Sequence, residues 1–160
     1  MGTPAQAVLR KAAPRWAFMQ GFQVAKNGFP YLDRLRIVQT PAFSVLLHRI
    51  HQPDVDRDPH DHPWPFASLI LSGSYRESVW DVREGSPRAA VPDHVRERPR
   101  WSLRTVGLGQ AHMITRVDGV LWTLVLTGRR RESWRFWTPA GPVDWREYLA
   151  AGESTDDNPW

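Results

Sequence analysis

The chain has 160 residues, of which 41% are hydrophobic and 24% charged, and its formal net charge is +4. These values are ordinary for one soluble globular domain with a core of its own. The absence of cysteine excludes disulfides, zinc-thiolate sites and cysteine nucleophiles. No apolar run approaches the roughly 20 residues of a membrane span, and the N-terminus lacks the apolar core of a signal peptide. We therefore expect a cytoplasmic protein with no membrane partner.

Short apolar runs typical of strands follow an N-terminal stretch with a helical pattern. Residues Ala5–Gln20 carry the helical pattern, broken by Pro14, and predict a short N-terminal helix or a pair of turns. From Leu35 onward, runs rich in β-branched and aromatic residues alternate with glycine, proline and aspartate. The predicted strands are Leu35–Gln39, Phe43–Ile50, Phe66–Leu71, Tyr75–Asp81, Trp101–Thr105, His112–Val117, Leu121–Thr127 and Trp134–Thr138. Many short strands at this spacing are typical of an all-β sandwich or barrel.

The segments between and after these runs favour turns, a loop and a second helix. Ser72-Gly73-Ser74 and Asp118-Gly119 predict short turns between runs of hairpin spacing. Arg83–Arg100 is polar, contains proline and predicts a surface loop. Asp144–Ala150 predicts a short C-terminal helix capped by its first residue. Glu153–Trp160 is a polar tail that we expect to be mobile.

These segments predict a single folded domain with an extension at each end. We expect residues 1–34 to form an N-terminal helical extension, residues 35–150 the β-barrel domain and residues 151–160 the mobile polar tail. The sequence contains no tandem repeat, low-complexity block or linker long enough to separate two domains.

The most informative motif is the histidine pair in Pro59-His60-Asp61-His62-Pro63. Side chains two residues apart on a strand point to the same face, and the proline after His62 disfavours helix there. Both imidazoles therefore face one side of an extended segment, which is how a strand offers two ligands to a divalent metal. His94, a lone histidine in the predicted loop, is expected to be solvated.

His112 is the candidate third ligand. It follows the turn-like stretch Gly107–Ala111 and opens an apolar run. A third imidazole at the start of a strand completes a facial triad if the sheet folds back on itself. Three protein ligands leave coordination positions for water, oxygen or substrate, as a catalytic site requires.

The two histidine motifs resemble those of the cupin family, which are small double-stranded β-helices of the jelly-roll type. The first cupin motif is His-x-His, three or four residues, glutamate, six residues and glycine, and the stretch from His60 to Gly73 reproduces this spacing. The second motif places Pro-x-Gly-x-x-His before the last ligand, and Gly107–His112 reproduces it with glycine in place of proline. The resemblance covers roughly residues 35–138. It implies an all-β, jelly-roll-type barrel, to which the patterns above add a short helix at each end.

One departure from the cupin pattern changes the ligand set that the resemblance implies. Phe66 occupies the position of the family's glutamate ligand and cannot bind a metal. The four-ligand site is therefore reduced to His60, His62 and His112. Three-histidine cupin sites occur in the thiol dioxygenases, which use iron and oxygen, and this likeness favours Fe(II). Zinc, manganese and nickel also suit three histidines.

Five further residues are candidates for catalysis or substrate binding. Tyr75 and Glu77 share one strand face. If that face points inward, Glu77 could act as a base or a replacement ligand and Tyr75 could donate a hydrogen bond; the alternative is an exposed glutamate. Arg49 could meet a substrate carboxylate or phosphate, or be exposed. Trp64 and Phe66 could form an apolar wall beside the metal, or Phe66 could belong to the core.

The basic run Arg129-Arg130-Arg131 lies at a turn before the last predicted strand. It predicts a solvated charge cluster, with anion or nucleic-acid contact as the alternative. No glycine-rich phosphate loop, nucleophile elbow or dinucleotide-binding motif is present. The sequence therefore does not support nucleotide binding or serine hydrolysis.

Three functions fit these residues, in decreasing order of support. The first is a non-haem iron(II) oxygenase or dioxygenase that acts on a small molecule through the three-histidine centre. The second is a cupin-type sugar isomerase or epimerase, in which Glu77 or Tyr75 transfers the proton. The third is a non-enzymatic metal- or ligand-binding module. We expect a small-molecule substrate and no nucleic-acid partner, and the cupin resemblance adds a homodimer as a further expectation.

Overall fold

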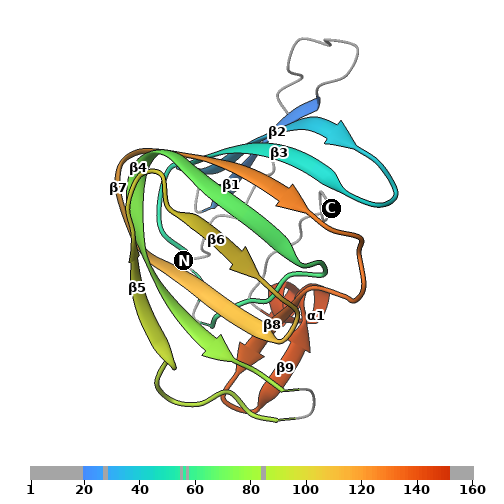
Figure 1. Cartoon of the computed structure of the whole chain (residues 1–160). Helices are drawn as coiled ribbons and strands as arrows, with labels where there is room; N and C mark the ends of the chain where they lie inside the picture. The colour runs from blue at the N-terminus through green and yellow to red at the C-terminus, as the bar shows by residue number, and fades with distance from the viewer. Residues whose placement is uncertain (1–19, 27–28, 55, 57, 84–85, 152–160) are drawn as a thin grey trace.

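Strands make up almost all of the regular structure, which confirms the predicted all-β class. The computed structural model (Figure 1) describes residues 20–151 apart from residues 27–28, 55, 57 and 84–85. The predicted N-terminal helix and the polar tail Glu153–Trp160 lie outside these residues, except for Gln20. The elements in chain order are β1 (Gln20–Lys26), β2 (Phe29–Gln39), β3 (Ser44–Ile50), β4 (Phe66–Asp81), β5 (His94–Arg98), β6 (Leu103–Val106), β7 (Gln110–Thr127), β8 (Arg135–Thr138), β9 (Gly141–Asp144) and α1 (Trp145–Ala151).

Two long strands, β4 and β7, hold the sheet together. They have 16 and 18 residues and pair antiparallel, from Phe66 opposite Thr127 to Asp81 opposite Gln110. The strand order is β1-β2-β3-β7-β4-β5. On β4, the first half pairs with β6 and the second half with β5. The sheet curves around its core as a jelly-roll-type barrel, with β8, β9 and α1 on the side away from β1 and β2 (Figure 1).

Glycines bend the two long strands at the places where the sequence predicts hairpin turns. Gly73 has a φ of 73° and Gly119 a φ of 71°, and the β4–β7 register shifts on both sides of Ser72. The strands therefore bulge and continue. The predicted turns at residues 72–74 and 118–119 are wrong, because a glycine with positive φ serves a bulge within a ladder as well as a chain reversal.

Strands also lie where the sequence pattern predicts none. β1 and the first part of β2 fall within the predicted helical extension, so the sheet begins at Gln20 rather than Leu35. The inner face of β2 carries Leu32 and Arg34, both buried, and the arginine interrupts the apolar alternation that marks a strand. β5 falls within the predicted loop Arg83–Arg100. The side chains of β5 are mostly exposed, so no apolar pattern marks it in the sequence. Backbone pairing with β4 stabilises the strand instead.

The core lies where β4 and β7 bend. Ile70, Tyr75, Ile114 and Leu121 form a buried cluster across the two strands. Ile50, from the end of β3, packs against this cluster. The apolar core therefore lies inside the curve of the sheet, between β4, β7 and the end of β3.

Helix α1 closes one end of the structure. Oδ1 of Asp144 accepts a hydrogen bond from the backbone N of Arg146 at 3.0 Å, which confirms the predicted cap. Tyr148 stacks on Phe136 with 4.0 Å between ring centroids and ties the helix to β8. None of the helical segments in the described part of the chain has the length and apolar character needed to cross a membrane.

Substitution of Gly73 by alanine should destabilise the fold. A Cβ at Gly73 would lie 2.8 Å from the carbonyl oxygen of Val120 and 2.9 Å from Cα of Leu121, in a left-handed conformation that strains alanine. We expect Gly73→Ala to lower the free energy of unfolding in urea by about 2 kcal/mol or more. Gly107→Ala is the matched control, because a Cβ there meets nothing within 4 Å. Equal stability of the two variants would contradict the role of Gly73 in the bend.

Candidate metal centre

Backbone hydrogen bonds hold His60 between β7 and β8. His60 N donates to the carbonyl oxygen of His112 at 3.0 Å, and His112 N donates to that of His60 at 2.9 Å. His60 also forms a β-bridge with Phe136. The His-x-His segment is therefore extended, as predicted, and lies directly beside the strand that carries the third histidine.

Asp61 sets the direction in which the histidine pair faces. Its buried carboxylate accepts hydrogen bonds from N and Nε of Arg135 at 2.8 and 3.0 Å and from Nε1 of Trp137 at 3.0 Å. Neighbouring side chains on a strand point to opposite faces, so this anchoring turns His60 and His62 toward the barrel interior. Asp61 was not predicted as a functional residue, although its place between two co-facial histidines was a signal.

Three imidazoles converge inside the barrel. One nitrogen from each of His60, His62 and His112 lies within 4.8 Å of the others, and Nε2 of His62 is 2.9 Å from Nε2 of His112. Two nitrogens that each bind one ion at about 2.1 Å lie about 3.0–3.4 Å apart, so small shifts suffice for ligation. Nδ1 of His60 is buried without a hydrogen-bond partner among the described residues, a cost that a bound ion would offset. These residues fit a divalent metal.

Burial keeps two of the three histidines in the neutral form that binds metals. Desolvation holds the pKa of His62 well below its usual range, and the neighbouring histidines, Arg104 and Arg34 lower it further. Desolvation also lowers the pKa of His112 well below its usual range, and Arg104 makes the largest electrostatic contribution. Both imidazoles are therefore neutral near pH 7, and a neutral ring nitrogen can bind a cation without first losing a proton.

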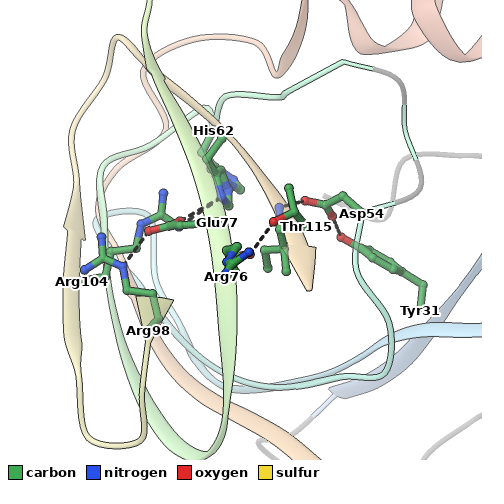
Figure 2. Close-up of polar contacts among 10 residues, drawn as sticks. Tyr31, Asp54, His62, Arg76, Glu77, Arg98, Arg104 and Thr115 are labelled. Carbon is green, nitrogen blue, oxygen red and sulfur yellow. Dashed lines mark hydrogen bonds and ion pairs between the residues drawn. The ribbon is translucent and has the colours of Figure 1, made fainter. Parts of the chain in front are cut away.

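Glu77 lies in a buried cluster with two arginines, Arg98 and Arg104 (Figure 2). Its Oε1 accepts a hydrogen bond from Nε of Arg98 at 2.7 Å. Its Oε2 lies 2.8 Å from Nη1 of Arg104 and 3.4 Å from Nδ1 of His112. Glu77 thus faces the interior, one of the two alternatives that the sequence left open. Nη1 of Arg104 also lies 3.2 Å from Nδ1 of His112, so Glu77 and Arg104 together orient the ring with its Nε2 toward His62.

Tyr75 also faces the interior, but it belongs to the core. Its side chain is buried with Ile70 and Leu121. Burial raises the pKa of its hydroxyl, although the nearby Arg104 opposes part of this effect. The hydroxyl therefore stays protonated near neutral pH and can donate a hydrogen bond, so the predicted role of Tyr75 as a donor stays a prediction.

Arg49 lies on the outer face of the sheet, which corrects its prediction as a substrate-binding residue. It stands opposite Trp122 in the β3–β7 ladder, with its guanidinium 5.9 Å from the tryptophan ring. Strand alternation places Leu46 and His48 on the inner face instead. There His48 Nε2 accepts a hydrogen bond from Nε of Arg34 at 2.8 Å. The arginine inside the barrel is therefore Arg34, which the sequence pattern did not single out because an arginine breaks the apolar alternation.

Phe66 is the first residue of β4, and Trp64 lies two residues before it in the proline-rich segment. The Phe66 ring meets that of His62 edge-on, with 4.8 Å between centroids. Trp64 is half-buried and lines a groove that also contains Arg34. Phe66 supplies an apolar wall beside the histidines, whereas contact of either aromatic residue with a substrate stays a prediction.

Comparisons with known proteins identify the fold. No family model matches the chain, and no curated protein does. Among solved structures, the chain is similar to Fe(II) HppE, with a TM-score of 0.55, 12% identity and coverage of 79% of this chain and 65% of that chain. HppE with the alternative substrate (S)-1-HPP gives a TM-score of 0.51, 13% identity and coverage of 78% and 65%. An RmlC-like cupin from Desulfovibrio desulfuricans gives a TM-score of 0.42, 15% identity and coverage of 61% and 82%.

This likeness establishes the fold alone. The chain spans 65% of the length of the HppE chains that it matches, at low sequence identity. It has the cupin jelly-roll fold that the two histidine motifs predict. Fold and site together define a jelly-roll-type barrel with a candidate three-histidine site for a divalent metal.

Replacement of Glu77 by glutamine should weaken metal binding. Glutamine keeps the shape of the side chain but removes the charge behind His112, and loss of such a partner typically weakens metal affinity about 10–100-fold. Titration of the metal-free protein with Zn(II) or Co(II) measures the effect, and circular dichroism checks folding. Glu97→Gln is the matched control, since Glu97 pairs with Arg76 on the surface. Unchanged affinity in a folded Glu77→Gln variant would rule out this positioning role.

Acid should destabilise the metal-free protein through its buried histidines. Burial and the charge of Arg34 lower the pKa of His48, and burial lowers those of His62 and His112. Below about pH 6.5 the unfolded chain binds protons that the folded chain does not bind. The free energy of unfolding then falls by up to about 1.4 kcal/mol per pH unit for each such histidine, and above that pH this effect is absent.

His48→Gln isolates one of these histidines. Glutamine retains an acceptor for Arg34 but does not titrate, and residue 48 is not among the three converging histidines. Urea denaturation from about pH 7 to about pH 5 should show a shallower loss of stability in His48→Gln than in the unmodified protein. Identical slopes would mean that His48 titrates alike in the folded and unfolded chains.

Proposed function

We propose that the protein is a metal-dependent cupin enzyme, specifically a non-haem iron(II) oxygenase that acts on a small molecule. The observation that carries this proposal is the convergence of three imidazoles, two of them held neutral, at one point inside the barrel. A three-nitrogen ligand set leaves coordination positions for oxygen and substrate. The likeness to Fe(II) HppE supports the fold. The use of iron and oxygen by this chain is what we propose from the ligand set.

In this proposal His60, His62 and His112 hold the ion, and neighbouring side chains orient and shield the three rings. Bound Fe(II) would supply the one-electron chemistry by which oxygen reacts with organic molecules. Glu77 holds the His112 ring with Nε2 toward the other two histidines. Phe66 covers one side of His62 with an apolar ring and excludes water there.

The contacts of Glu77 and Tyr75 favour the oxygenase over the isomerase alternative. A proton-transfer base must lie within reach of its substrate. Oε1 of Glu77 accepts a hydrogen bond from Arg98 at 2.7 Å, and Oε2 lies 2.8 Å from Arg104, so the carboxylate is ion-paired with two arginines. Tyr75 is buried in the core with its pKa raised.

Metal loading followed by a spectroscopic test of the iron site examines the proposal without knowledge of the substrate. The metal-free protein is offered Fe(II), Zn(II), Mn(II) and Ni(II), and the bound metal is measured after gel filtration. The Fe(II) form is then exposed anaerobically to nitric oxide. We expect one ion per chain and the EPR signal of a high-spin iron–nitrosyl, since the three-histidine site leaves open positions.

Histidine variants decide whether the ion is bound where we propose. His60→Ala and His112→Ala should each abolish stoichiometric metal binding, whereas the exposed His94 provides the control variant His94→Ala. Metal binding that survives both site variants would overturn the proposal. Iron binding with no nitrosyl signal, and no oxygen consumption with a panel of small molecules, would favour a binding module or an isomerase.

A further inference from the structure

A groove of about 210 Å³ lies where the ends of β2 and β7 and the start of β3 meet, and it is rich in arginine. Arg34, Arg36 and Arg130 line it together with Trp64 and Phe43, and none of its lining residues in the described part of the chain is acidic. Three guanidinium groups in one small concavity are a feature that attracts anions. This charge distribution points to an anionic ligand.

Strand alternation places two of these arginines on the inner face of β2. Arg34 stands opposite His48 and Arg36 opposite Leu46 in the β2–β3 ladder. Arg34 is buried, and its Nε donates to Nε2 of His48 at 2.8 Å, which fixes the plane of the guanidinium. Burial and the charge of Arg36 lower the pKa of Arg34, so an anion entering between the two would relieve their repulsion.

The third arginine reaches the groove because the loop after β7 is fastened to the proline-rich segment. Gly128 N donates to the carbonyl oxygen of Pro65 at 2.8 Å, and Arg131 N donates to that of Pro63 at 2.7 Å. This pairing brings Arg130 and Trp64 to the same groove. Of the basic run at residues 129–131, only Arg130 is among the residues that line the groove.

The groove adjoins the segment that carries the histidine pair. Trp64 lies two residues after His62, and Thr127, which also lines the groove, pairs with Phe66, whose ring meets that of His62 at 4.8 Å. A small molecule held by the arginines would therefore lie beside the aromatic residue that contacts His62.

We propose that this groove binds the anionic group, a carboxylate or a phosphate or phosphonate, of a small-molecule substrate whose apolar part lies against Trp64. Guanidinium groups hold such anions through paired, charge-assisted hydrogen bonds of fixed geometry. An aromatic wall beside the anion site favours a ligand with an apolar portion over inorganic anions alone. The assignment of this ligand as the substrate rests on the proposed function, whereas anion binding in the groove does not.

Calorimetric titration of the metal-free, full-length chain tests the anion site. The probes are inorganic phosphate, methylphosphonate and propionate, with n-propanol as the uncharged comparison. We expect saturable binding of at least one anion and none of n-propanol, and the preferred anion distinguishes the phosphorus-containing class from carboxylates. Because Arg34 is buried and its loss could prevent folding, the informative variants are Arg36→Gln and Arg130→Gln, each expected to weaken binding about tenfold or more.

Arg129→Gln is the matched control, since it removes the same charge from the neighbouring position, outside the residues that line the groove. Equal binding by Arg36→Gln, Arg130→Gln and Arg129→Gln, or no binding of any of the three anions, would overturn the proposal. The His60→Ala and His112→Ala variants separate the two proposals. Anion binding that persists in these variants while metal binding is lost supports two distinct sites. Anion binding without metal binding in the unmodified chain would refute the iron centre alone.

Discussion

The reciprocal backbone hydrogen bonds between His60 and His112 are the constraint on which the candidate site depends. Directly opposed residues on antiparallel strands have Cβ atoms about 4.5–5.5 Å apart and project to one face. The two rings accordingly lie 4.8 Å apart, and strand alternation adds His62 at 5.1 Å from His112. A shift of one residue in this pairing would turn the His-x-His pair to the opposite face. The convergence of the histidines is therefore a consequence of strand register.

Positive charge inside the barrel shapes the chemistry of this site. Arg34 and Arg104 are both buried, and a buried cation is tolerated where an anion or hydrogen-bond acceptors accompany it. Glu77 is the anion beside Arg104, and His48 is an acceptor for Arg34. The same two arginines oppose protonation of His62. The buried arginines therefore also help to keep His62 neutral, the form in which it can bind a cation.

Local patterns were sufficient to predict an all-β sandwich or barrel and to select three of the six histidines, and the cupin resemblance added the jelly-roll type. Both predictions depend on the strand period and on the spacing between histidine and glycine. The patterns were insufficient for β5, whose exposed side chains carry no apolar period, and for β2, where Arg34 and Arg36 occupy inner positions. At Gly73 they predicted a turn instead of a bulge, because the same backbone conformation serves both.

The sequence by itself determined which residues could bind a metal and that Phe66 replaces the expected glutamate. These are local properties, since ligand chemistry belongs to the side chain and the two-residue period to the single strand. Only the tertiary structure decided what those residues meet. The arginines around Glu77, the anchoring of Asp61 to Arg135 and the outward position of Arg49 all depend on which strands become neighbours and which sheet face closes on the core. That choice is made by packing over the whole domain, so no local pattern encodes it.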